Sequence, residues 1–300
     1  MNTKEFRALA GPYVVTDGSR FRLKHFDPKG PGPKATQHDA KKFLKKSVKT
    51  LSALQEKLYA QDRWGVLLIF QAMDAAGKDS AIKHVMSGID PKGCQVYSFK
   101  APSSEELDHD FMWRTSKALP ERGRIGIFNR SHYEEVVALR VHPEWLGPQR
   151  LPSGERDEAF WQARHEDINA FERYLARNGF VIRKFFLNVS RAEQRRRFLD
   201  RLVRPEKNWK FAMGDLAERA RWRDYMAAYE DTIRATSTPH APWVVIPADD
   251  KKFARTVVAA AVIDALNRLS LEFPPIDAAD RRELARARRT LEREGRRIKP

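Results

Sequence analysis

Five short apolar runs, each followed by a helical pattern, constrain the fold of this chain more than any other feature. The first run, Trp64–Phe70, is continuously apolar and rich in branched residues, which is typical of a strand buried on both faces of a parallel sheet. Strands that alternate with helices predict an α/β fold with a parallel five-stranded sheet and helices on both faces. The predicted strands are Trp64–Phe70, Gln95–Phe99, Arg124–Phe128, Phe180–Val189 and Trp243–Pro247.

The segments between these strands predict helices, because apolar residues recur in them at helical spacing. The predicted helices are Asp39–Gln61, Lys78–Ser87, Glu105–Leu119, His132–Val141, Glu158–Arg177, Arg191–Val203, Glu218–Arg234 and Phe253–Leu271. In an open parallel sheet the ligand binds at the carboxyl ends of the strands. Functional motifs are therefore expected where a strand passes into the loop that follows it.

The composition changes at both ends of the predicted domain. Residues 1–37 contain scattered Pro, Gly and Lys and predict an irregular N-terminal arm. Residues 38–276 predict a single domain, and residues 277–300 predict a charged tail with a helical pattern over Ala279–Gly295. The tail is interpreted either as a docking helix for a partner subunit or as a solvated end.

The charge of the chain points to an anionic partner. Lys and Arg number 56 and Asp and Glu 40, which gives a formal net charge of +16. This excess fits nucleic acid, a membrane surface or a phosphate-rich substrate. The single cysteine, Cys94, excludes an intrachain disulfide. The N-terminus lacks an apolar signal core and no apolar run is long enough to cross a bilayer, so we expect a soluble cytoplasmic protein.

The loop after the first strand resembles a phosphate-binding loop. Gly77 and Lys78 match the end of the general pattern G-x-x-x-x-G-K-[ST], with a strand before them and a helix after them. Backbone amides at the start of such a helix bind phosphate oxygens, and Lys78 adds a positive charge. The phosphate-binding residues predicted in this loop are Ala75, Ala76, Gly77, Lys78 and Ser80.

The same loop departs from the general pattern in a way that predicts a metal ion. Ala72 replaces the first glycine, and Asp79 replaces the hydroxyl residue that normally contacts magnesium. Asp74 adds a second carboxylate. Two carboxylates beside a phosphate repel it unless a divalent cation lies between them, so Asp74 and Asp79 are predicted to hold Mg²⁺ directly or through water. The alternative is a polar helix start in which Asp74 is the N-cap.

A second motif follows the third predicted strand. Asn129 is a neutral oxygen donor where P-loop enzymes commonly use Asp, and Arg130 can clamp a phosphoryl group with its planar fork. Either Glu134 or Glu135 can supply the missing carboxylate to a metal, and both lie at a helix start, where the dipole favours them. The alternative is that Asn129-Arg130-Ser131 only caps the next helix.

A basic segment at about residues 203–216 predicts a helical lid. It follows an Arg-rich helix and contains Pro205 together with cationic and aromatic residues. A cationic lid neutralises phosphates and excludes water when it closes. Arg204 and Lys207 are the predicted phosphate-binding residues, and most of the other arginines are expected on a solvated helix face. Trp209 can stack on a base or pack the lid onto the sheet.

Three segments in this order resemble the polyphosphate kinase 2 family. They are Asp74-Ala75-Ala76-Gly77-Lys78-Asp79, then Phe128-Asn129-Arg130-Ser131-His132-Tyr133-Glu134, then Pro205-Glu206-Lys207-Asn208-Trp209-Lys210. The resemblance implies a thymidylate-kinase-like P-loop fold, Mg²⁺, and phosphoryl transfer between inorganic polyphosphate and nucleotides by a homo-oligomer, a dimer or a tetramer. It also implies that Asp74, Lys78, Asp79 and Arg130 are catalytic, and that Arg204 and Lys207 belong to the lid.

One residue divides the family further. Many members carry Asp where this chain has Asn129, and the form seen here resembles the subgroup that phosphorylates both AMP and ADP, giving ADP and ATP. Two other functions are weighed against this one. An ATP-dependent small-molecule kinase could use the same fold, although Asp79 argues against it. A nucleic-acid-binding protein would explain the basic charge, but the chain carries no recognition motif for nucleic acid.

Overall fold

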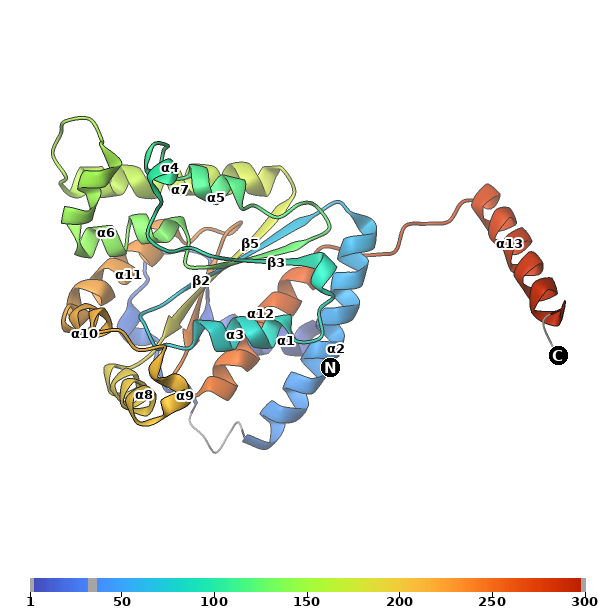
Figure 1. The fold of residues 1–300 in the computed structure, drawn as a ribbon, viewed down its shortest axis with the longest axis horizontal. Helices are drawn as coiled ribbons and strands as arrows, with labels where there is room; N and C mark the ends of the chain where they lie inside the picture. The colour runs from blue at the N-terminus through green and yellow to red at the C-terminus, as the bar shows by residue number, and fades with distance from the viewer. Residues whose placement is uncertain (1–2, 32–36, 298–300) are drawn as a thin grey trace.

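The computed structural model describes residues 3–31 and 37–297, and its centre is a six-stranded sheet (Figure 1). The strand order is β1-β6-β5-β2-β4-β3. The five predicted strands are confirmed and pair in parallel, whereas β1 pairs with β6 in the antiparallel direction. The strands are β1 (Val14–Val15), β2 (Gly65–Gln71), β3 (Cys94–Ser98), β4 (Ile125–Asn129), β5 (Phe180–Asn188) and β6 (Trp243–Pro247).

Helices cover both faces of the sheet (Figure 1). The α-helices are α1 (Thr3–Ala10), α2 (Gln37–Gln61), α3 (Lys78–Met86), α4 (Ser104–Leu107), α5 (Trp113–Lys117), α6 (Ala138–Val141), α7 (Glu158–Arg177), α8 (Arg191–Val203), α9 (Pro205–Asn208), α10 (Gly214–Ala220), α11 (Trp222–Thr236), α12 (Lys251–Asn267) and α13 (Ala278–Arg297). Short 3₁₀ turns are η1 (Gly11–Tyr13), η2 (Leu23–His25), η4 (Pro91–Gly93), η5 (His132–Glu135) and η6 (Pro143–Gln149).

The continuous apolar sequence of β2 is explained by burial on both faces. Leu68 lies in a core cluster with residues of α2, α3 and α12, whereas the next residue, Ile69, lies in a second cluster with residues of α7 and α11. Alternate side chains of a strand point to opposite faces, so a strand covered on both sides needs apolar residues throughout. Both Leu68 and Ile69 are completely buried.

The N-terminal segment is more regular than predicted. Residues 3–10 form α1, which packs against α12 and buries Phe6, and Val14 pairs with Val244 to place β1 at the sheet edge. The prediction of an irregular arm is therefore wrong for these residues. A two-residue strand has no readable alternation, because its conformation depends on the partner strand and not on its own pattern. Residues 1–2 and 32–36 lie outside the described residues.

Two predicted helices are broken in the structure. The segment predicted as Glu105–Leu119 forms α4 and α5, and between them Asp110 accepts a hydrogen bond from the amide of Met112, which turns the chain. The segment predicted as His132–Val141 forms η5 and then α6. Val136 and Val137 lie at the break and are buried, consistent with the lower helix preference of β-branched residues.

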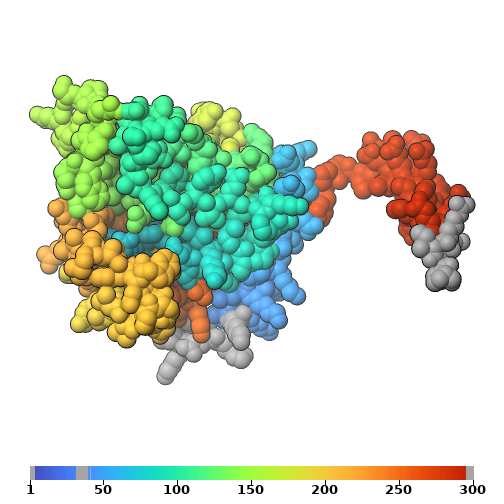
Figure 2. All heavy atoms as spheres, viewed as in Figure 1, coloured from blue at the N-terminus to red at the C-terminus, as the bar shows by residue number. Residues whose placement is uncertain are grey.

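The C-terminal tail stands away from the rest of the molecule. Figures 1 and 2 show α13 separated from the sheet by an extended linker. The helical prediction for the tail is confirmed, and Leu284 and Leu291 are exposed on this helix. Among the described residues, no helix combines the length and the hydropathy that a membrane span requires.

Candidate functional site

The two predicted motifs lie side by side at the carboxyl edge of the sheet. β2 and β4 are parallel neighbours in which Phe70 pairs with Asn129, so the loops that follow them leave the sheet at the same level. The amide of Arg130 donates to the carbonyl of Phe70 at 3.0 Å. The site expected from strand order is therefore assembled from both motifs.

The phosphate loop has strained backbone geometry and an open helix start. Ala75 adopts a φ of 59°, a left-handed conformation that costs about 1–3 kcal/mol in a residue other than glycine. Gly77 has a φ of 108° and is the residue before α3; no side chain of the described residues caps this helix. The alternative in which Asp74 is the N-cap is therefore wrong. The first amides of α3 remain available to a ligand.

Each carboxylate of the loop is bonded to a residue of the second motif. Arg130 donates to Asp74 Oδ1 at 3.1 Å, and Asn129 Nδ2 donates to Asp79 Oδ1 at 3.0 Å. Arg130 also has a positive φ of 64°. Lys78 Nζ donates to the carbonyl of Ala72 at 2.7 Å, and burial lowers the pKa of this amine. The structure thus brings together all four residues predicted to be catalytic.

Of the two glutamates considered as further metal ligands, only Glu134 lies at this site. The charges around Lys78 are those of Asp74, Asp79, Glu134 and Arg130. Burial raises the pKa of Glu134, and Arg130 and Lys78 oppose the shift. In the orientation that satisfies both of its ends, the Gln71 amide donates to Glu134 Oε1 at 2.7 Å.

Glu135 lies in a different buried cluster, where it accepts hydrogen bonds from Arg164 at 3.1 Å and from Gln149 at 2.6 Å. The prediction that Glu135 could replace the missing carboxylate is not supported by this position. The capping alternative for the second motif applies to Ser131 alone, which accepts a hydrogen bond from the amide of Tyr133 at 3.1 Å. Asn129 and Arg130 point their side chains to the phosphate loop instead.

The donor set suits a metal ion that is shared with a phosphate. Asp74 and Asp79 each use one oxygen in the bonds above, and their second oxygens have no hydrogen-bond partner within residues 3–31 and 37–297. The described part of the chain contains no group of three acidic, His or Cys side chains placed to hold a metal. Mg²⁺ commonly takes one or two carboxylates and completes its shell with water and substrate phosphate. These two carboxylates therefore fit Mg²⁺.

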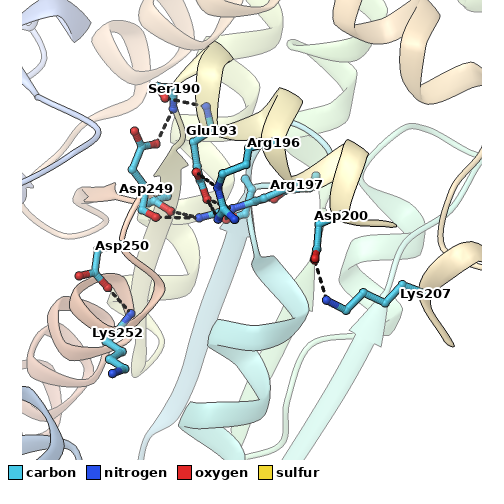
Figure 3. Close-up of polar contacts among 12 residues, drawn as sticks. Ser190, Glu193, Arg196, Arg197, Asp200, Lys207, Asp249, Asp250 and Lys252 are labelled. Carbon is cyan, nitrogen blue, oxygen red and sulfur yellow. Dashed lines mark hydrogen bonds and ion pairs between the residues drawn. The ribbon is translucent and has the colours of Figure 1, made fainter. Parts of the chain in front are cut away.

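The predicted lid, about residues 203–216, contains α9, the turn after it and the start of α10. Arg204 Nε lies 2.7 Å from Asp200 Oδ1. Lys207 Nζ lies 2.6 Å from Asp200 Oδ2, as Figure 3 shows. Both predicted phosphate-binding cations thus share one carboxylate of α8. Trp209 is 78% exposed, so it does not pack the lid onto the sheet.

Helix α8 contributes contacts that sequence reasoning missed. Arg197 was not singled out from the other arginines of this helix, but it is 5% exposed and donates to the carbonyls of Ala75 and Ala76. Gln194 donates to the carbonyl of Asp74 at 2.9 Å. The signal was present, because both residues share a helix face with the apolar Phe198. Ser80 is in the first turn of α3, and its hydroxyl accepts a hydrogen bond from Arg255 of α12.

An open cavity of about 930 Å³ lies beyond the carboxyl end of β5. Its walls include Asn188 at the end of β5, Arg191 in the first turn of α8, and Trp222 and Met226 of α11. Phe26 closes it from the N-terminal segment, where its carbonyl accepts a hydrogen bond from Asn188 at 2.7 Å. Helix α8 therefore borders this cavity with its first turn and contacts the phosphate loop with its next turn.

Comparisons with known proteins agree on one family. A family model described as Polyphosphate kinase 2 matches residues 34–274. The chain is 48% identical over 292 residues to the ADP-polyphosphate phosphotransferase of Rhodopseudomonas palustris, covering 97% of this chain and 99% of the relative. It is 42% identical over 271 residues to the AMP/ADP-polyphosphate phosphotransferase of Meiothermus ruber, covering 89% and 96%. A crystal structure of polyphosphate kinase 2 from Arthrobacter aurescens TC1 matches with a TM-score of 0.83 at 42% identity, covering 92% and 96%.

Proposed function

Since this chain belongs to the polyphosphate kinase 2 family and is a polyphosphate-dependent nucleotide kinase on a P-loop fold, we propose that it phosphorylates both AMP and ADP with Mg²⁺ at the phosphate loop. The observation that carries the proposal is the pairing of Asp74 with Arg130 and of Asp79 with Asn129. These contacts place two carboxylates, an arginine and a neutral amide around the loop that ends in Lys78.

The requirement for Mg²⁺ follows from charge. Asp74, Asp79 and Glu134 are three carboxylates, and the two cations beside them are Lys78 and Arg130. Polyphosphate and the nucleotide both bring further negative charge into this site, which is unfavourable without a cation. Mg²⁺ supplies positive charge to the phosphate oxygens when it is bound. Asp74 and Asp79 would hold it, directly or through water, through the oxygens that have no partner among the described residues.

The chain's own residues position and neutralise the reacting phosphates. An oxygen of the nucleotide's terminal phosphate attacks the end phosphorus of polyphosphate in line, and the bridging P–O bond breaks, so the polyphosphate leaves one unit shorter. Arg130 clamps the transferred group, and Lys78 with the first amides of α3 binds its oxygens. In-line transfer of this kind depends on positioning and on charge rather than on a strong base.

Asn129 supports the use of two acceptors. Its amide donates to Asp79, whereas an aspartate here would put a second carboxylate about 3 Å from the first. A neutral residue at this point lowers the negative charge around the acceptor phosphate. We assign the tolerance of both AMP and ADP to this neutral residue. Of the two relatives above, one is named for ADP and one for AMP and ADP.

The cavity beyond β5 is assigned to the nucleoside. It combines the apolar side chains of Trp222, Met226 and Phe26 with the polar side chain of Asn188, as small-molecule sites commonly do. It also lies at the carboxyl edge of the sheet, where ligands bind in open α/β folds. Since α8 borders both this cavity and the phosphate loop, a nucleotide bound there would direct its phosphates toward the loop.

The test is a set of parallel incubations. AMP or ADP is supplied with polyphosphate and Mg²⁺, and ADP and ATP are measured as products. Formation of ADP from AMP and of ATP from ADP, both abolished by EDTA and restored by excess Mg²⁺, is expected. Turnover of ADP alone would refute the two-acceptor proposal, and full turnover in EDTA would refute the metal proposal. ATP with AMP and no polyphosphate is the control for an ATP-dependent kinase.

The proposal extends to assembly and location. We expect a homo-oligomer, a dimer or a tetramer, which light scattering of the purified chain measures, and we expect it in the cytoplasm. The expected partners are polyphosphate, AMP, ADP and ATP, and we expect neither nucleic acid nor a membrane among them. A shift of duplex DNA or RNA at physiological salt would contradict the exclusion of nucleic acid.

A further inference from the structure

Arg197 connects helix α8 to two loops: the phosphate loop and the loop that follows β6. It belongs to α8, is 5% exposed, and lies among the polar contacts drawn in Figure 3. Its two terminal nitrogens donate to four backbone carbonyls that come from two separate loops. These acceptors are Ala75 at 3.1 Å, Ala76 at 2.6 Å, Ala248 at 2.6 Å and Asp249 at 3.1 Å.

The bonds to the phosphate loop fix the direction of its peptide groups. In a planar trans peptide the C=O and the N–H point in opposite directions. The carbonyl of Ala76 points at Arg197, so the amide of Gly77 points away from Arg197. A side chain added at Gly77 would meet Arg197 Nη1 at 3.6 Å, which also places this arginine on one side of the loop.

Arg197 also supports Ala75, the loop residue with the strained backbone. Ala75 has a φ of 59°, and its carbonyl accepts a hydrogen bond from Arg197. A left-handed conformation at alanine persists only when surrounding contacts fix it. The loop carbonyls would otherwise be free to turn toward a bound phosphate, where they would repel it.

The fork of Arg197 is itself held in place. Glu193 accepts a hydrogen bond from Arg197 Nε at 2.7 Å, and Glu193 is anchored in the first turn of α8 because its amide donates to the N-cap Ser190. The neighbouring Arg196 bonds to the same glutamate but is 67% exposed. Arg196 therefore shares the partner and the helix of Arg197, and within the described residues its hydrogen bonds go to Glu193 and not to the loop.

We propose that Arg197 is a positioning residue for phosphoryl transfer, which holds the phosphate-loop carbonyls away from the substrate so that the loop amides face it. The inference rests on the proposed use of this loop for phosphate. Arg197 acts through the backbone and touches no reacting atom. Its positive charge also lies under the loop, on the side opposite the substrate.

The test compares Arg197→Met and Arg197→Lys with Arg196→Gln. Misplacing groups that stabilise a transition state commonly costs about 100-fold in rate, so we expect kcat of the Arg197→Met enzyme to fall about 100-fold or more. Lysine keeps the charge but cannot reach four carbonyls, and we expect a loss of at least about tenfold in kcat. The KM for AMP should change little in both, because the nucleoside cavity is not lined by Arg197. Arg196→Gln should retain the wild-type kcat.

A second readout separates positioning from general stability. In ¹⁵N-labelled protein, tripolyphosphate with Mg²⁺ should shift the amide resonances of Gly77 and Lys78, and this shift should be lost in the Arg197→Lys protein while its melting temperature stays close to that of wild type. A folded Arg197→Lys enzyme with wild-type kcat and an unchanged Gly77 shift would overturn the proposal. If Arg197→Met does not fold, the lysine variant decides alone.

The two proposals fail in different ways. If the wild-type protein transfers no phosphate from polyphosphate, the proposed function fails, and the role of Arg197 is then judged by the Gly77 shift with tripolyphosphate. If the wild type is active and the lysine variant equals it, only the role of Arg197 fails.

Discussion

Replacing Lys184 with methionine is predicted to destabilise the protein by about 3–5 kcal/mol. Lys184 lies on β5, directly beneath the second motif, and is completely buried. Its amine donates to Glu172 at 2.6 Å, to the hydroxyl of Tyr133 at 2.9 Å and to the carbonyl of Thr236 at 2.7 Å. Methionine fills a similar volume without a donor, so the change leaves the buried Glu172 carboxylate without its cation.

The size of the destabilisation follows from removing Lys184 while its partner Glu172 stays in place. Breaking a buried ion pair by removing one partner costs about 3–5 kcal/mol, because the other charge stays buried and uncompensated. For a chain of 300 residues this corresponds to a fall in melting temperature of about 5–10 °C. Thermal unfolding followed by circular dichroism measures it. Lys184→Met/Glu172→Gln, which removes both charges, should recover a large part of the loss.

The pH dependence gives the sharper test. Burial alone would raise the pKa of Glu172, but Lys184 and His132 offset it and leave this pKa below its usual value. In the wild type this carboxylate therefore adds stability above its unfolded pKa of about 4, and that stability is lost as the pH falls through the lowered value. In the variant burial is no longer opposed by Lys184, so the pKa of Glu172 rises and the variant loses stability as the pH rises above about 4.

The difference in melting temperature between wild type and Lys184→Met should accordingly be larger at pH 8 than at pH 5. His132 strengthens the trend. Its pKa is lowered by burial, and losing the nearby Lys184 charge makes it easier to protonate beside Glu172 at low pH. A difference that is equal at both pH values, or a loss of less than about 1 kcal/mol, would refute the view that an uncompensated buried charge is the cause.

Three further substitutions test the site itself. Asp79→Asn should reduce kcat by about 100-fold or more at an unchanged melting temperature, and near-normal turnover would remove the metal argument. Asn129→Asp should change the ratio of the initial rates with AMP and with ADP by about tenfold, because it adds a carboxylate near the acceptor phosphate, and an unchanged ratio would show that Asn129 does not influence the choice of acceptor. Asp200→Asn frees Arg204 and Lys207 from their shared carboxylate, so KM for polyphosphate should fall and depend more steeply on salt; an unchanged KM would show that the lid cations do not meet the substrate.

The strands could be predicted from the sequence because their environment leaves little choice. β2 is covered on both faces, so every residue from Val66 to Phe70 had to be apolar, and the predicted limits agree within one residue. β1 could not be predicted, because Val14 and Val15 are extended only through their pairing with β6. The break between η5 and α6 could not be predicted either. Val136 and Val137 fit a helical pattern in the sequence, but in the structure they are buried where the two elements meet.

The sequence indicated the edge at which the site lies, but not which of two adjacent glutamates belongs to it. Glu134 and Glu135 differ by one position in a 3₁₀ turn, and this step directs one toward Lys78 and the other toward Arg164. A 3₁₀ helix has three residues per turn, so neighbouring side chains are about 120° apart and their directions depend on where the turn begins. That start is set by Ser131, whose capping bond is visible only in three dimensions.

The consecutive arginines of α8 show how far composition can mislead. Arg195, Arg196 and Arg197 are chemically identical, but Arg195 and Arg196 are exposed whereas Arg197 is buried beneath the phosphate loop. Burying a guanidinium is costly unless its donors are satisfied, and here four carbonyls and a glutamate satisfy them. A solvated arginine cannot make these contacts, and two of the four carbonyls, those of Ala75 and Ala76, belong to the loop that we propose binds phosphate. Under the two proposals, the basic residues of the chain serve two separate purposes: the lid cations Arg204 and Lys207 bind the polyanion, and the buried Arg197 shapes the loop that receives it.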